Sequence, residues 1–291
     1  MESGGSTPVY RIVVGEDIFY LRLAEQPGED RVAEACVHQL LLEAGVSVPA
    51  IVRYESQPSE LDRSATLTTR MPGVPLLESP GLDSDDVRGI ARAAGRDLAR
   101  INQVPVEGFG WVESVAADGS SLVAEHTARS AWTKEYARAA QDVMGSGLFT
   151  DYSLDLLQSE IARWRAHPDR TQSFLAHGDF DVTHIFMAPS TYTYTGIIDF
   201  GEIRGADRLY DLGHALLQDA QPGRPPVFPD LLAGYREIVL LPDTVLAEIY
   251  DQAIAIGTRQ LAIFRRRSSP YTCGLAAQIE TLLGVNREWR E

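Results

Sequence analysis

The hydrophobic pattern of the chain changes character once, near residues 70–74. Before that point there is one helical pattern, at about 30–43, and four β-type runs, at 9–14, 18–23, 49–54 and 65–69. After it helical spacing dominates, and a single β-type island interrupts it at 173–200. Met71-Pro72-Gly73 separates the two parts, and Pro and Gly commonly end regular elements. The pattern predicts an α+β protein with a β-rich lobe over 1–71 and a larger, mainly helical lobe over 72–291.

Composition narrows the function classes. The 291 residues carry a net charge of −15, which disfavours a nucleic-acid partner because phosphate binding needs a basic surface. No apolar stretch is long enough to cross a bilayer, and the N-terminus has no basic-then-apolar leader, so no membrane partner is expected. The two isolated cysteines, Cys36 and Cys273, predict neither a disulfide framework nor a metal site and favour the cytoplasm.

The segment 174–216 contains the polar residues best placed for chemistry. One apolar run ends at His177-Gly178-Asp179, and a second, after a turn at 189–190, ends at Asp199-Phe200-Gly201. Phosphoryl transfer needs two such acids, because one carboxylate accepts the proton of the attacking hydroxyl while the other holds Mg²⁺ against the phosphates. Since the two acids end adjacent β segments, we expect them to face one cleft.

This pattern resembles the aminoglycoside-phosphotransferase family, a branch of the protein-kinase-like fold. The family has His-Gly-Asp, a strand, and then hydrophobic-Asp-aromatic-Gly, as this chain has. The resemblance implies a bilobal fold, with a small antiparallel β N-lobe that binds ATP or GTP and a helical C-lobe with the acceptor site. It also implies the catalytic set His177, Asp179 and Asp211, with Asp179 as the base, Asp211 orienting its loop, and Asp199 binding Mg²⁺.

His184 departs from the family pattern. It stands five residues after Asp179, where the family usually has Asn. A neutral imidazole is a poorer Mg²⁺ ligand than an amide oxygen, so we expect His184 to reach the metal through water or to hold Asp179 in place. Macrolide phosphotransferases and the enzymes that modify the 2″ hydroxyl of aminoglycosides also resemble this variant. A buried histidine without a role in the site is the alternative.

The predicted nucleotide site is also unusual. Kinases place a Lys on a strand of the small lobe, paired with a helix Glu, whereas here the corresponding residues are Arg22 and Glu34. Arg keeps the charge and can fork onto phosphate oxygens. The remaining residues predicted to bind nucleotide are Ser6, in a Gly-rich turn, and the hinge residues Thr69, Arg70 and Met71. A surface arginine and a flexible tail are the alternatives for Arg22 and for the turn.

The acceptor is predicted from charge. Glu202 and Asp207 follow the second acidic loop, and together with the excess of acids they suit a cationic, aminoglycoside-type antibiotic, which implies a role in resistance. Each of these acids alone is also typical of an ordinary helix surface. A macrolide kinase and a metabolic kinase for choline, fructosamine or homoserine remain alternatives. A pseudokinase that binds nucleotide without turnover is an alternative of another class.

Overall fold

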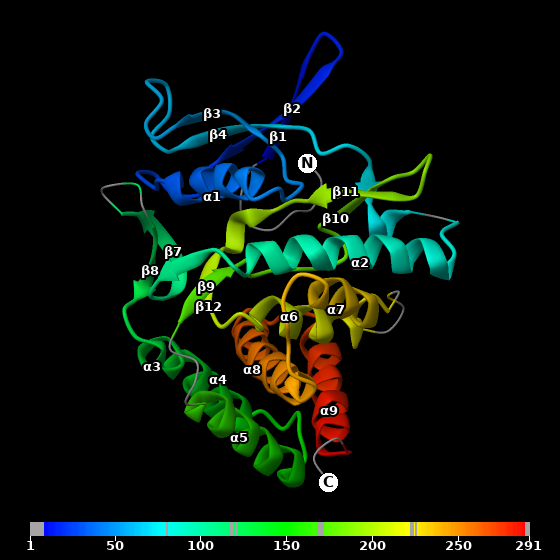
Figure 1. Ribbon diagram of the computed structural model, residues 1–291. Helices are drawn as coiled ribbons and strands as arrows, with labels where there is room; N and C mark the ends of the chain where they lie inside the picture. The colour runs from blue at the N-terminus through cyan, green and yellow to red at the C-terminus, as the bar shows by residue number, and fades with distance from the viewer. Residues whose placement is uncertain are drawn as a thin grey trace.

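The computed structural model describes residues 9–79, 81–116, 119, 121–167, 172–221, 224 and 226–288. Figure 1 shows the blue and cyan N-terminal strands at one end of the molecule, the long helix α2 crossing its middle, and the later helices filling the other end. This two-lobed α+β arrangement confirms the predicted fold class.

The first sheet is antiparallel and has the order β1-β2-β4-β3. Its strands are β1 (Val9–Val14), β2 (Asp17–Leu23), β3 (Ile51–Glu55) and β4 (Ala65–Thr69). Gly15 turns the β1–β2 hairpin with φ of +63°, which Gly adopts without steric cost. Helix α1 (Val32–Glu43) lies beneath this sheet and buries Ala33, Val37 and Leu41.

A second sheet connects the hinge region to the β island. The short strand β5 (Val74–Pro75) pairs with β10 (Ile185–Ala188), which pairs with β11 (Thr193–Ile197). A 3₁₀ turn, η1 (Leu76–Glu78), follows β5, and a second, η2 (Phe200–Glu202), lies just after β11. The segment after the hinge therefore lies beside the strand pair that leads into Asp199.

A five-stranded closed barrel is the part of the fold that the sequence pattern missed. Its order is β12-β7-β8-β6-β9, from β6 (Pro105–Glu107), β7 (Phe109–Val115), β8 (Leu122–His126), β9 (Ser173–Ala176) and β12 (Arg204–Ala206). Only β9 falls within the expected island. Strands β6 and β12 have three residues each and pair with distant strands, so local periodicity carries little of their signal. Strands β7 and β8 are neighbours in the chain, but two register shifts interrupt their pairing.

The helices form the rest of the larger lobe. They are α2 (Ser84–Ile101), α3 (Arg129–Trp132), α4 (Lys134–Met144), α5 (Asp151–Ala166), α6 (Tyr210–Asp219), α7 (Phe228–Arg236), α8 (Val245–Arg266) and α9 (Thr272–Glu288). Helix α8 is central, because it packs against α4, α5, α6 and α9. None of the helices in the described part of the chain is long and apolar enough to span a membrane.

Helices α2 and α7 approach each other closely at two glycines. A Cβ atom on Gly95 of α2 would overlap the backbone carbonyl of Leu231, and one on Gly234 of α7 would overlap that of Arg92. Leu98 and Ile101, further along α2, are fully buried. Close backbone contact at the glycines therefore fixes the position of α2, whose C-terminal end leads into the site described below.

We expect Gly234→Ala to lower the free energy of unfolding by about 1–3 kcal/mol, because an added methyl group must displace backbone in a packed interface. Denaturant unfolding followed by circular dichroism measures the change. Gly89→Ala is the matched control, since Gly89 lies on the exposed side of α2 with open space at its Cβ position. It should be neutral or stabilising by about 0.5–1 kcal/mol. Equal stabilities for the two variants would contradict this packing argument.

Candidate active site

The buried carboxylate of Asp211 anchors the loop that contains Asp179. Its Oδ2 accepts hydrogen bonds from the backbone N–H of His177 at 2.8 Å and from Nδ2 of Asn102 at 2.8 Å, and its Oδ1 accepts from the N–H of Gly178 at 3.0 Å. Asp211 begins α6 and Asn102 directly follows α2, so the loop is held by two helices. Sequence reasoning missed Asn102, because nothing local distinguishes it from an ordinary helix-ending residue.

His177 connects this loop to the loop of Asp199. Its ring is fully buried, and Nε2 donates to the carbonyl oxygen of Ile198 at 2.9 Å. Burial lowers the pKa of His177, and the neighbouring His184 ring lowers it further. The next residue, Gly178, has φ of +87°, and a Cβ there would overlap the carbonyl of Glu202. The His-Gly pair therefore serves the geometry of the loop rather than contact with a ligand.

Asp199 lies in an ion cluster that joins the two lobes. Nη2 of Arg22, on β2, contacts Oδ1 of Asp199 at 2.5 Å, and Nη1 contacts Oε1 of Glu34, on α1, at 2.6 Å. Burial raises the pKa of Asp199, but Arg22 and the nearby His184 outweigh it and bring the pKa to about 2. Asp199 is thus ionised at neutral pH, and its φ of +70° is a strained value typical of functional loops.

His184 lies between the two acids. Its Nδ1 donates to the backbone carbonyl of Asp179 at 2.8 Å, and its Nε2 lies 3.6 Å from Oδ2 of Asp199. Its side chain is 15% exposed, so it belongs to the site rather than to the surface. It can hold the Asp179 backbone and face a ligand of Asp199 at the same time.

A single cavity of about 650 Å³ brings these groups together. Arg22, Glu34, Asp179, Asp199 and Glu202 all line it. Of its sixteen lining residues eight are Asp or Glu and two are Arg, so the cavity is strongly acidic. Its barrel-side wall contains Trp111, Val112 and Glu113, from a strand that the sequence pattern did not predict.

Glu202 and its neighbour Arg204 form one side of this cavity. Nη2 of Arg204 donates to Oε2 of Glu202 at 2.7 Å, and the Arg204 guanidinium stacks on the ring of Trp111 at 4.2 Å. Burial raises the pKa of Glu202, and the nearby Asp179 adds to that effect. Glu202 remains nearly half exposed, so its carboxylate is accessible to a ligand.

Asp207 does not join these residues. It is buried, and its two oxygens accept from Nε and Nη2 of Arg129 at 3.1 to 3.3 Å. Arg129 also donates to the carbonyl oxygens of Trp164 and Arg165, which fixes the pair between α3 and α5. An acid held by a buried arginine is not presented to an acceptor. Asp207 does not line the acidic cavity, and its contact with an acceptor stays a prediction.

The other residues predicted to bind nucleotide are not among those lining the cavity. Thr69 is the last residue of β4, and its Oγ1 accepts a hydrogen bond from the N–H of Ala50 at 3.0 Å. Arg70 is exposed, and Met71 is buried against Gly196. Ser6 lies outside the described residues. Contacts of these four residues with a nucleotide stay a prediction.

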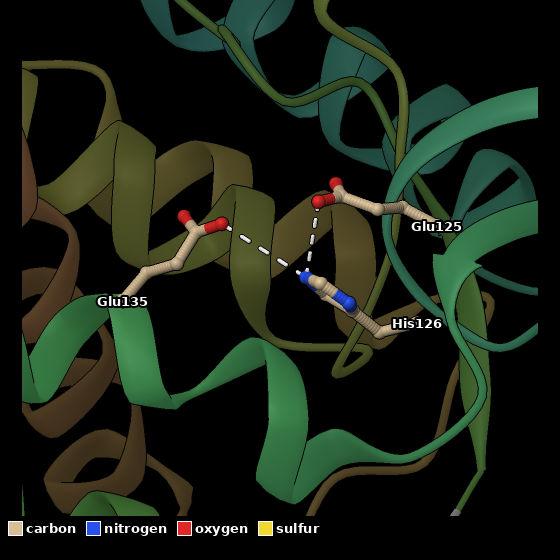
Figure 2. Close-up of side chains that lie close together, drawn as sticks. All are labelled: Glu125, His126 and Glu135. Carbon is tan, nitrogen blue, oxygen red and sulfur yellow. Dashed lines mark ion pairs between the residues drawn. The ribbon is translucent and has the colours of Figure 1, made fainter.

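A separate cluster of possible metal ligands lies at the end of β8. Figure 2 shows Glu125, His126 and Glu135 pointing toward one another. Nε2 of His126 lies 3.1 Å from Oε1 of Glu125 and 3.9 Å from Oε1 of Glu135, and Arg259 contacts the other oxygen of Glu135 at 3.2 Å. None of the three lines the acidic cavity. The arrangement suits an ion-pair network on the wall of the larger lobe.

The fold and the two acid-bearing loops define a phosphotransferase of the protein-kinase-like class. The sequence matches the profile of the phosphotransferase enzyme family, APH, over residues 1–246, and the chain belongs to that family.

Individual relatives agree with this assignment. Streptomycin 3″-kinase of Streptomyces griseus is 30% identical over 155 residues, 52% of this chain and 53% of that protein. The chain thus matches about half the length of this curated relative. An APH(4)-Ia mutant in complex with ADP and hygromycin B has a TM-score of 0.69 at 13% identity, covering 97% of this chain and 92% of that one. The GDP and kanamycin complex of APH(2″)-IIIa has a TM-score of 0.64 at 17% identity. The match covers 100% of this chain and 93% of that one. These structures share the fold.

We expect Asp207→Ala to lower the free energy of unfolding by about 3–5 kcal/mol, because it leaves the buried Arg129 charge without its carboxylate. Urea unfolding measures the loss. Glu55→Ala is the control, since its ion pair with Arg53 on β3 is exposed on both sides and such a pair contributes about 0–1 kcal/mol. A native stability for Asp207→Ala would show that the Arg129 pair does not hold the lobe together.

Proposed function

We propose that this chain is a small-molecule kinase that transfers the terminal phosphoryl group of ATP or GTP to a hydroxyl group of an aminoglycoside-type acceptor. The observation that carries the proposal is the cavity in which Arg22, Asp199, Asp179 and Glu202 converge. Arg22 and Asp199 suit the phosphates and their metal, Asp179 suits the attacking hydroxyl, and Glu202 suits a cationic group beside it.

The residues at Asp199 fit a magnesium ion. Mg²⁺ prefers oxygen ligands, and the Asp199 carboxylate is ionised, lines the cavity, and keeps Oδ2 away from Arg22. Nε2 of His184 lies 3.6 Å from the same oxygen, and because Mg²⁺ prefers oxygen to imidazole nitrogen, contact of His184 with the metal would run through water. When bound, the ion would neutralise charge on the phosphates and the leaving group.

Asp179 is the proposed base. Its side chain is nearly half exposed and lines the cavity, while its backbone is held by His184 and its loop by Asp211. A carboxylate fixed in this way can accept the proton of the acceptor hydroxyl as that oxygen attacks the phosphorus. His177 and Asp211 are proposed to position the loop rather than to contact the acceptor, because both are fully buried.

Arg22 is proposed to grip phosphate oxygens. Glu34 holds one side of its guanidinium, and the other side now contacts Asp199. A planar guanidinium can fork onto two oxygens at once, so it can supply the charge that kinases usually take from Lys. The presence of both Asp179 and Asp199 in one cavity favours turnover over a pseudokinase role.

The acidic lining supports a cationic acceptor. Glu202, Glu113 and Asp179 all line the cavity, and no Lys is among its lining residues. Aminoglycosides carry several ammonium groups, whereas a macrolide would be favoured by an apolar pocket. The relatives named for streptomycin, hygromycin B and kanamycin support the same class, and they motivate a role in resistance.

The proposal also assigns the lobes and the location. Residues 1–71, with Ser6 and the hinge residues 69–71, would hold the nucleotide, and residues 72–291 would hold the acceptor. The two cysteines, Cys36 and Cys273, are free, which suits a reducing cytoplasm.

We expect Asp179→Ala to reduce kcat by about 10²–10⁴-fold with little change in nucleotide affinity, because the base acts on the acceptor hydroxyl. Asp199→Ala should instead weaken binding of the magnesium–nucleotide complex and turnover together. Steady-state kinetics with calorimetric titration of a non-hydrolysable nucleotide separates the two effects. Asp155→Asn, on the exposed side of α5, is the control. An Asp179→Ala enzyme that keeps a tenth of the native kcat would exclude Asp179 as the base.

The acceptor class is tested with radiolabelled ATP and GTP against streptomycin, hygromycin B, kanamycin, a macrolide and small amino alcohols. We expect transfer to at least one aminoglycoside, with an acceptor KM that rises with salt because ion pairs are screened over about 8 Å at physiological ionic strength. Glu202→Gln should raise that KM and leave the nucleotide KM unchanged.

Three outcomes would contradict the aminoglycoside assignment. Transfer to the macrolide alone, with little salt dependence, would identify a macrolide kinase. Transfer to an amino alcohol alone would identify a metabolic kinase. Nucleotide binding without transfer or hydrolysis would identify a pseudokinase.

A further inference from the structure

His214 is a buried histidine that approaches Asp179 from inside the protein. It lies on α6, has no exposed surface, and does not line the cavity that Asp179 lines. Its Nε2 is 3.4 Å from Oδ1 of Asp179 and 3.0 Å from Nε2 of Gln260, on α8. Its Nδ1 is 2.9 Å from the carbonyl oxygen of Phe180. One imidazole thus links two helices to the residue proposed as the base.

The contacts fix which nitrogen carries the proton. A carbonyl oxygen can only accept, so Nδ1 of His214 donates to Phe180. In the neutral ring Nε2 therefore presents a lone pair, to which the Gln260 amide donates. While Asp179 is ionised, no proton lies between its Oδ1 and Nε2. Because Nε2 has a single lone pair, it can accept a hydrogen bond from Asp179 only when that carboxyl group is protonated and its O–H takes the place of the Gln260 amide.

We propose that His214 is a positioning residue for phosphoryl transfer, whose Nε2 accepts a hydrogen bond from the Asp179 carboxyl group after it has taken the acceptor's proton. This inference rests on the proposed function. In the step, the acceptor O–H bond breaks and an O–H bond forms on Asp179. The electron pair left on the acceptor oxygen forms the new bond to phosphorus, and the bond from phosphorus to the nucleoside diphosphate breaks. The proton stays on Asp179 beside Nε2 until the product leaves and solvent removes it.

The geometry of α6 supports this role. Asp211 and His214 are three residues apart on the helix, so they lie on the same face. Asp211 holds the backbone of the loop through the N–H groups of His177 and Gly178, and His214 reaches the Asp179 side chain. One helix face thus sets both the path of the loop and the surroundings of the Asp179 carboxyl group. A protonated carboxyl group without this partner would lose a hydrogen bond in the transfer step.

The test compares His214→Phe, which keeps an aromatic ring but removes both nitrogens, with His214→Gln, which keeps an acceptor and a donor. We expect His214→Phe to lower kcat by about ten- to a hundredfold, since leaving a buried polar group unsatisfied changes rate constants on this scale. Both KM values should stay within about twofold, because the ring contacts neither ligand. His214→Gln should recover kcat to within a few-fold of native. His167→Phe, at the end of α5, is the control.

The assay uses the full-length chain, the acceptor on which the native enzyme is active, and calorimetric binding of a non-hydrolysable nucleotide to show that each variant is folded. Should His214→Phe not fold, His214→Leu, which also lacks both nitrogens, takes its place. A native kcat in the nitrogen-free variant, or His214→Gln impaired as severely as it, would overturn the inference. So would a loss carried wholly by KM. Failure of the native enzyme to transfer phosphate to any acceptor would instead count against the proposed function.

Discussion

The organisation of the site depends on one buried carboxylate. Asp211 has no exposed surface, yet it accepts hydrogen bonds from His177, Gly178 and Asn102. A carboxylate without these donors would be costly to bury, so the folded state requires all three to be in place. Because Asn102 ends α2 and Asp211 begins α6, the shape of the loop depends on helix packing. The close contact between α2 and α7 at Gly95 and Gly234 is thus linked to the position of Asp179.

A second interaction connects the lobes. Arg22, on the N-terminal sheet, contacts Glu34 on α1 and Asp199 in the larger lobe, and these side chains are mostly buried. Gly201 allows this contact, since a Cβ there would lie 3.1 Å from Nη1 of Arg22. The arginine therefore neutralises the carboxylate that the proposed function gives to magnesium. Nucleotide binding would have to exchange this ion pair for contacts with phosphate and metal. The binding free energy would therefore be the difference between the free energy of the new contacts and that of the ion pair.

Local sequence signals were sufficient to predict the N-terminal hairpin, the long helix α2 and the two acidic loops. β-type runs and turn residues predicted the N-terminal hairpin, and helical spacing predicted α2. The spacing of the two motifs predicted that Asp179 and Asp199 would share a cleft, and both residues line the same cavity. The barrel strands β6 and β12 were missed because they have three residues each and pair over long sequence distances. Strands β7 and β8 pair locally, but register shifts interrupt their ladder. The burial of Asp207 could not be predicted because its partner, Arg129, lies 78 residues away. The sequence alone could not indicate which polar residues would be buried together.

The proposed role of Arg22 in the nucleotide site has a practical consequence for labelling. Lys134 is the only lysine in the chain, and it lies exposed at the start of α4, outside the acidic cavity. Reagents that carry a nucleotide and acylate a nearby amine depend on a lysine beside the phosphates, and a guanidinium that stays protonated does not react in that way. Amine-directed activity profiling would therefore overlook this protein in a cell extract even when its site is occupied. A dicarbonyl reagent selective for arginine would detect it, and bound nucleotide should protect Arg22 from modification.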